Sequence, residues 1–271
     1  MRAARRRFAP LAGAIALALA APGCAPRIVQ VPELVPTMRV ARYEAALRQR
    51  EARGTAVDAQ VLLWAEVPAG ERLPGAEGRL LLVGPDAFRL RVASLIGTAI
   101  DLGARGESLA AYVPSRRQGV TLDAPGDSLG VTHPGSLVFR AATAAWRPPE
   151  RAWEEATWRD SLLDVRWREG EDTLAVAVGS HGLPVHASLA RTGAATIRIE
   201  YGGWDRSQGL AWPLRFVVSD DGGGFRLSCR VTRLRFPARA DSLRLAVPMP
   251  RGTEQLTILE LRRMLERMGA M

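Results

Sequence analysis

The feature that most constrains this chain is a strict alternation of apolar residues with arginine between Phe88 and Val92. A period of two places the apolar side chains on one face of a β-sheet and the arginines on the other. The neighbouring apolar runs at 79–83, 98–103 and 108–113 are short and are separated by glycine-containing turns. Residues 78–113 therefore predict an antiparallel meander with one buried face.

One part of this stretch does not follow the pattern. Leu95 and Ile96 come directly before Gly97, in a connection between two strands where polar residues are usual. These two side chains either turn inward and pack, or they present an apolar tip to another molecule.

Further strands and helices follow from the same kind of pattern. Alternating apolar residues predict strands at 57–67, 163–167, 174–178, 185–189, 196–201, 214–219 and 225–236, and helical spacing predicts helices at 37–53 and 134–146. In the last strand the apolar parity flips, which predicts a β-bulge near Thr232 and Arg233. The fold class is mainly β (α+β): a single, strongly curved antiparallel half-barrel of about eleven strands, with helices covering its concave side.

The N-terminus reads as a targeting segment. Four arginines precede an apolar run at 11–21 and the small-residue sequence Ala21-Pro22-Gly23-Cys24, which resembles the lipobox of bacterial lipoproteins. We expect a lipoprotein signal peptide at 1–23, acylation of Cys24 and a proline-rich tether at 24–36. A plain signal peptide with an incidental cysteine is the alternative. The remaining regions are a domain at 37–250 and a C-terminal amphipathic helix at 251–271, starting near Thr253, whose apolar stripe is Ile258, Leu261, Leu265 and Met268.

The charge of the chain does not indicate nucleic-acid binding. The formal net charge is +9, and removal of four signal arginines leaves 9 − 4 = +5. The arginines are spread over alternating strand positions and are not gathered on one helix or loop, so we expect no nucleic-acid partner. A basic surface nevertheless favours approach to anionic lipid headgroups.

Residues with catalytic potential are few and scattered. His133, His181 and His186 stand beside turns or prolines, and no nucleophile elbow or metal-binding spacing accompanies them. Cys229 shares the parity of the buried positions of its strand, which favours a small buried hydrophobe over a reactive thiol. We expect no enzyme activity, no metal and no cofactor.

Four tryptophans lie between Trp146 and Trp167, with acidic residues among them. A stacking platform for nucleic acid would need basic neighbours. These rings are interpreted as partly buried core or cavity-lip residues.

Four stretches occur in a telling order: residues 92–102, residues 136–139 with the exit at 146–148, residues 199–205, and residues 212–214 followed by the glycine-rich turn at 221–224. In this order they resemble the LolA/LolB lipoprotein-localisation family, and within it the outer-membrane lipoprotein receptors of the LolB type. Together the four stretches cover about residues 40–236.

The resemblance implies a half-open barrel lidded by helices, whose apolar cavity accepts lipoprotein acyl chains from a periplasmic LolA-like carrier. It also implies a monomer held at the periplasmic face of the outer membrane by its own lipid. In the family, a loop leucine just before a glycine places the lipoprotein in the membrane; Ile96 matches that position, with Leu95 beside it. Burying both side chains in lipid would contribute on the order of 3 to 5 kcal/mol. Strand parity and the resemblance together give these cavity-lining candidates: Leu63, Leu82, Phe88, Leu90, Val92, Phe139, Ile197, Ile199, Tyr201 and Phe216.

Two regions depart from the family pattern. Residues 147–193 are longer and richer in tryptophan, and the helix after Pro250 is additional. A protein of this fold that carries another lipid, or that acts as a structural or interaction component of an envelope complex, is the alternative function.

Overall fold

The computed structural model describes residues 36–53, 56–66, 75–94, 97–123, 134–206, 209–237, 242–257, 259–260 and 263. The chain divides into two compact units, Met1–Pro32 and Glu33–Met271, and all described residues belong to the second. The predicted signal peptide at 1–23, Cys24, Leu95 and Ile96 lie outside the described residues. Among the described residues, no helix combines the length and apolar character needed to span a bilayer.

The described part of the chain is mostly β. Its strands are β1 (Ala56–Glu66), β2 (Ala76–Val83), β3 (Ala87–Ser94), β4 (Gly97–Arg105), β5 (Ser108–Val113), β6 (Gln118–Leu122), β7 (Thr157–Arg159), β8 (Leu162–Glu169), β9 (Asp172–Val178), β10 (Pro184–Arg191), β11 (Ile197–Asp205), β12 (Trp212–Asp220), β13 (Arg226–Arg235) and β14 (Glu254–Gln255). Its helices are α2 (Pro36–Arg53), α4 (Pro134–Thr143) and α5 (Glu150–Glu154), with 3-10 turns η1 (Pro114–Arg116) and η2 (Ser242–Leu245).

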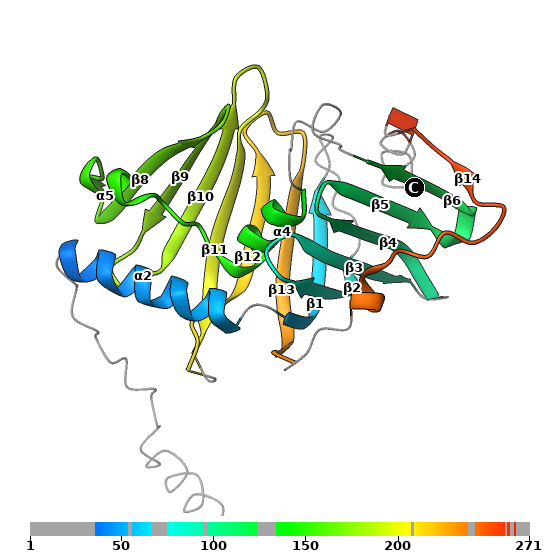
Figure 1. Cartoon of the computed structure of the whole chain (residues 1–271), viewed down its shortest axis with the longest axis horizontal. Coiled ribbons are helices and arrows are strands. Elements are labelled where there is room, and N and C mark those ends of the chain that lie inside the picture. Colours follow the sequence, from blue (N-terminus) through cyan, green and yellow to red (C-terminus); the bar gives the residue numbers. More distant parts are fainter. Residues whose placement is uncertain are drawn as a thin grey trace, which may run out of the picture. The chain divides into compact units, whose positions relative to one another are not determined.

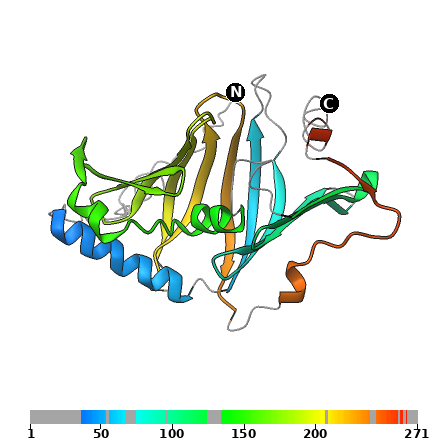
Figure 2. The same ribbon diagram turned by 45° about the horizontal axis from the view of Figure 1, so that its top comes forward.

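All these strands form one sheet, in the order β14-β6-β5-β4-β3-β2-β1-β13-β12-β11-β10-β9-β8-β7 (Figure 1). The chain builds outward from β1 to β6, passes through α4 and α5 to the far edge, and returns strand by strand to pair β13 with β1. Within the described residues, β14 and β7 form the two edges of the sheet, so the sheet is not closed. Figure 2 shows how strongly it curves.

The sheet has two distinct faces, which we call the core face and the outer face. The core face carries the odd residues of β1 and the even residues of β2 and β3, such as Val57, Leu82 and Phe88, which are in register with one another. The helices α2, α4 and α5 add Tyr43, Phe139 and Ala152 to the same buried cluster. All three helices therefore cover the concave core face, as predicted.

The eleven predicted strands are all present, and the structure adds β6, β7 and β14. Each added strand is five residues or shorter. None shows a clear alternation in the sequence, because a strand this short can be held by backbone hydrogen bonds to its neighbours.

The start of the predicted C-terminal helix is wrong. The residues after Thr253 form β14, which pairs in parallel with the outer side of β6. The backbone N–H of Glu254 donates to Arg117 O and that of Leu256 to Gly119 O, at 2.9 and 2.8 Å. Unpaired groups of the β6 edge thus compete with helix formation at this point. Leu259, Glu260 and Arg263 are helical, whereas the predicted stripe from Ile258 to Met268 lies outside the described residues.

The predicted bulge is present in β13. Gln60 pairs with Arg233 and Val61 pairs with Val231, so that Thr232 is the extra residue. Its hydroxyl donates to Gln60 O at 3.2 Å. The parity flip in the sequence therefore identified the bulge correctly.

Candidate functional site

All ten predicted cavity residues lie in one apolar cluster on the core face. Strand pairing sets Leu82 opposite Phe88 and Tyr201 opposite Phe216, the remaining strand candidates share the face of these pairs, and Phe139 comes from α4. Six are buried (Leu63, Leu82, Phe88, Phe139, Ile199 and Phe216) and four are half-buried (Leu90, Val92, Ile197 and Tyr201). The structure brings the ten together, and their lining of a cavity stays a prediction.

Burial on the core face changes from one end of the strands to the other. A row of half-buried apolar side chains follows one end of the sheet; this apolar rim consists of Leu189, Ile197, Val218, Leu227, Val92 and Ile100. Pairing joins Leu189 to Ile197, Val218 to Leu227, and Val92 to Ile100 across adjacent strands. β3 ends at Ser94 and β4 begins at Gly97 at this end of the sheet.

The other end of the strands is closed by a buried polar network. The hydroxyl of Tyr43 in α2 donates to the backbone oxygen of Trp146, which follows α4. The indole N–H of Trp146 donates to Tyr201 Oη at 2.6 Å, and Tyr201 Oη donates to Arg140 O at 3.4 Å. Burial raises the pKa of both phenols above its usual value, so each hydroxyl keeps its proton. The network ties α2, the exit of α4 and β11 together.

Two arginines of α2 are buried at the same end. Arg50 donates to Ala144 O at 3.3 Å and its guanidinium lies 5.7 Å from the Trp204 ring, while burial lowers its pKa. Arg39 donates to Ser161 O at 2.6 Å and stacks 4.4 Å from Trp158.

The predicted apolar stripe of this helix, Val40, Tyr43 and Leu47, did not include the arginines, and the structure shows Arg39 and Arg50 buried beside it. Positions 39, 43, 47 and 50 have the spacing of one helical stripe, which is the signal that would have found them.

The tryptophans between residues 146 and 167 divide into three kinds. Trp146 and Trp167 are buried, Trp153 is half-buried against Tyr43, and Trp158 is 45% exposed. The prediction of core or lip positions holds for the first three. The exposed Trp158 is instead covered on one side by the Arg39 guanidinium.

Cys229 is buried on the core face between Leu63 and Phe216, its register partners. Burial raises the pKa of its thiol to about 12, which keeps it protonated. The prediction of a small buried hydrophobe is confirmed.

The described histidines are not gathered into a site. His181 is exposed and His186 is half-buried, with its pKa lowered by burial, whereas His133 lies outside the described residues. Within the described ranges, no three His, Cys, Asp or Glu side chains come close enough together to hold a metal ion.

Comparison with known proteins identifies the fold. No protein-family model and no curated protein sequence matches the chain. A solved LolA superfamily protein from Nitrosomonas europaea superposes with a TM-score of 0.52 at 14% identity, over 79% of this chain and 98% of that one. A DUF1329 family protein from Desulfovibrio piger superposes with a TM-score of 0.50 at 10% identity, over 76% and 96% of the two chains. The chain therefore has a LolA-like fold, and this likeness does not single out the LolB type.

Proposed function

We propose that this chain is a lipid-anchored envelope protein that binds acyl chains on its core face and accepts or transfers lipoproteins into the outer membrane. Cys24 carries the anchor, a LolA-like periplasmic carrier is the partner, and the body acts as a monomer without a cofactor. The LolA-like fold and the apolar core face beneath the helices support this proposal.

The apolar rim is the observation that carries the proposal. Side chains deep in the cluster, such as Leu82 and Ile199, are fully buried, whereas the rim leaves six apolar side chains half in contact with water. Three cross-strand pairs of half-buried apolar side chains at one end of a sheet favour binding of an apolar ligand. The end of the strands that the buried polar network joins to α2 would stay fixed, while acyl chains enter from the apolar rim at the opposite end.

Leu95 and Ile96 complete the proposed pathway. In the sequence they stand between the end of β3 and the start of β4, and an outward-pointing pair would enter the bilayer beside the acyl chains being delivered. Their function is membrane placement of the cargo, separate from its binding.

The alternative function has its own support. Val165, Val176 and Ile199 are completely buried under the helices, and a filled core suits a structural or interaction component of an envelope complex. The amount of lipid that the protein takes up separates the two functions.

The first experiment measures uptake of a fluorescent fatty acid by Val92→Glu, with Leu81→Glu as the matched control. Both residues are half-buried and lie on neighbouring strands, Val92 on the core face and Leu81 on the outer face. We expect Val92→Glu to lose most of the uptake, because a carboxylate in the apolar rim opposes acyl binding, and Leu81→Glu to retain it. Uptake absent in the unaltered protein, or unchanged in a folded Val92→Glu variant, contradicts acyl binding at the rim.

The second experiment tests the loop. The double variant Leu95→Glu/Ile96→Glu is loaded with acyl chains and then mixed with outer-membrane vesicles. We expect normal uptake and lost delivery, since charges at the tip oppose insertion into lipid. Normal delivery by the double variant would rule out the proposed function of this loop.

A further inference from the structure

Two arginines face each other on the outer face, away from the helices. Arg215 of β12 is directly opposite Arg230 of β13 in the antiparallel register, and both are exposed. Neither makes an ion pair or side-chain hydrogen bond with another described residue. Like charges directly opposite each other destabilise a sheet, so this pair calls for a compensating anion.

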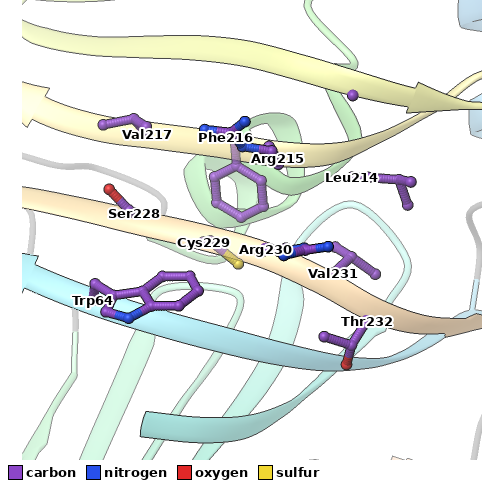
Figure 3. Close-up of a pocket in the computed structure, with 11 residues that line it drawn as sticks. Trp64, Leu214, Arg215, Phe216, Val217, Ser228, Cys229, Arg230, Val231 and Thr232 are labelled. Carbon is purple, nitrogen blue, oxygen red and sulfur yellow. The ribbon is translucent and has the colours of Figure 1, made fainter. Parts of the chain in front are cut away.

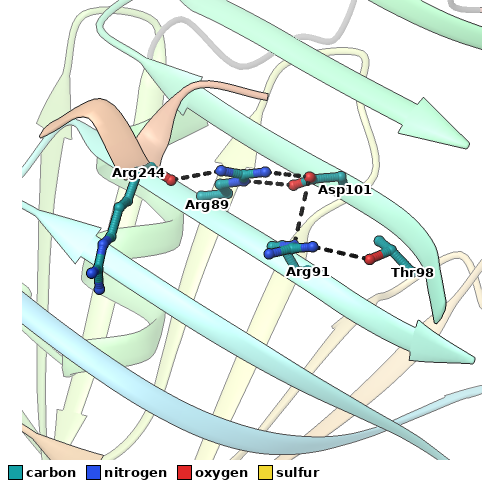
Figure 4. A network of polar contacts seen from close by, with 5 residues as sticks. All are labelled: Arg89, Arg91, Thr98, Asp101 and Arg244. Carbon is teal, nitrogen blue, oxygen red and sulfur yellow. Dashed lines mark hydrogen bonds and ion pairs between the residues drawn. The ribbon is translucent and has the colours of Figure 1, made fainter. Parts of the chain in front are cut away.

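Other arginines of the outer face already have such an anion. Arg79 makes a two-point contact with Asp58, with distances of 2.8 and 2.5 Å. Arg89 does the same with Asp101, which also lies 3.7 Å from Arg91 (Figure 4). The cross-strand pair on β12 and β13 differs from these in having no carboxylate.

The pair lines a groove of about 900 Å³ formed by β1, β12 and β13 (Figure 3). Trp64 and Ser228 are in register in the next row, and Val217 lies opposite Ser228 on the other side. No described residue that lines the groove is acidic. The outer-face residues Arg215, Arg230, Ser228, Trp64 and Val217 therefore combine two cations and a hydroxyl with an aromatic and an aliphatic side chain. The groove is also lined by Gly203, Leu214, Phe216, Cys229, Val231 and Thr232.

The strand on the far side leaves the groove open. Gly202 of β11 is the register partner of Arg215, and a Cβ placed on it would meet nothing within 4 Å. The nearest carboxylate of that strand, Glu200, lies opposite Val217 and is 3.9 Å from Arg226. The Glu200 carboxylate is therefore paired with Arg226.

We propose that this groove binds the phosphate of an anionic lipid headgroup. The two guanidiniums supply forked N–H donors that match phosphate oxygens, and Ser228 adds a hydroxyl donor. The half-buried indole of Trp64 and the side chain of Val217 contact the glycerol and the first methylenes, since indole rings favour the boundary between headgroup and hydrocarbon. The mixture of apolar and cationic groups in one groove selects a lipid over a free phosphate or an acidic peptide. This site is on the opposite face from the acyl-binding rim and does not depend on it.

The test is calorimetric titration of the full chain carrying Cys24→Ser, so that no acyl anchor contributes. The ligands are a short-chain phosphatidylglycerol below its micelle concentration, the corresponding zwitterionic phosphatidylcholine, and inorganic phosphate. We expect binding of phosphatidylglycerol, with an affinity about tenfold lower for each arginine lost and about 100-fold lower in Arg215→Gln/Arg230→Gln, as for a charged hydrogen bond at the low end of its usual strength.

Two further variants make the result specific. Arg105→Gln/Arg168→Gln removes the same charge from exposed positions outside the groove and should leave affinity within about twofold. Gly202→Glu places a carboxylate opposite Arg215 in open space, so it should fold normally and weaken binding about tenfold. Melting curves confirm that each variant is folded.

The proposal is wrong if the two double variants lose affinity equally, because the effect would then be one of net charge. It is also wrong if inorganic phosphate binds as well as phosphatidylglycerol, or if only an acidic peptide binds. Failure of fatty-acid uptake in the rim experiment leaves this result unaffected, so the two proposals fail separately.

Discussion

Tyr201→Phe tests the polar network that closes one end of the core face. The hydroxyl accepts the buried indole N–H of Trp146 at 2.6 Å and donates to Arg140 O at 3.4 Å. Trp146 has no exposed surface, so its N–H would lose its partner without gaining water. Leaving a buried donor unpaired costs about 1 to 3 kcal/mol of stability. Loss of the 3.4 Å hydrogen bond to Arg140 O adds little to this cost. We expect a loss of about 2 kcal/mol in the free energy of unfolding.

Urea unfolding followed by circular dichroism measures this loss as a lower midpoint at an unchanged slope. For a body of this size it corresponds to a fall of about 4 to 8 °C in melting temperature. Tyr112→Phe is the matched control, because Tyr112 is the remaining tyrosine of the chain and its hydroxyl makes no hydrogen bond with another described residue. Its effect should stay within about 0.5 kcal/mol.

A double-mutant cycle extends the test. Tyr43 and Tyr201 both bond to Trp146, so Tyr43→Phe combined with Tyr201→Phe should deviate from additivity by about 0.5 kcal/mol or more. If Tyr201→Phe lowers the free energy of unfolding no more than Tyr112→Phe does, the Tyr201 hydroxyl does not hold the Trp146 indole. The proposed polar network between α2, the exit of α4 and β11 would then be wrong.

Three further outcomes follow from local geometry. Gly135→Ala should destabilise the protein by about 3 kcal/mol in urea unfolding, because the added Cβ would lie 2.0 Å from Asp86 O. Gly202→Ala is the control and should be near neutral, since its Cβ would meet nothing within 4 Å. Equal effects of the two variants would contradict the close approach of α4 to the β2–β3 turn. Asp220 accepts hydrogen bonds from two backbone N–H groups in its turn, and these hold its pKa below the usual value of about 3.9. The stability that this carboxylate contributes is therefore complete above about pH 3.9 and is lost as the pH falls through the pKa of the folded state. The difference in urea midpoint between the unaltered protein and Asp220→Asn should therefore shrink between about pH 5 and pH 2; a constant difference would contradict the assignment. In a Cys24→Ser background, Cys229 should react with a thiol reagent only after unfolding, since its pKa is about 12 and it is buried; rapid labelling of the folded protein would exclude its core position.

The local elements of this fold were predictable because their signals are local. The alternation from Phe88 to Val92 identified a strand, and the turn before it contains Gly84 with a φ of 64°. The parity flip identified the bulge at Thr232 without knowledge of its partner strand. The resemblance of residues 92–102 and 199–205 to the LolA/LolB family agreed with the fold that the structural comparisons found.

The elements that were missed depend on partners distant in the chain. β14 forms because β6 presents an unpaired edge, more than a hundred residues earlier. Helical spacing places Arg50 on the stripe of Tyr43 and Leu47, but the oxygen that accepts its N–H, Ala144 O, belongs to another part of the chain. Neither partner can be recognised from neighbouring residues, since propensity and spacing report only the nearest turn or strand.

The sequence by itself determined which side chains share a face, because alternation along a strand follows from its covalent geometry. Alternation, together with the family resemblance, therefore selected the ten core-face candidates before any pairing was known. Only the tertiary structure decided which of them stay half-buried, since that depends on where α2 and α4 cover the sheet. Only the tertiary structure placed Arg215 opposite Arg230, because the register between strands is decided by the assembled sheet and its bulges.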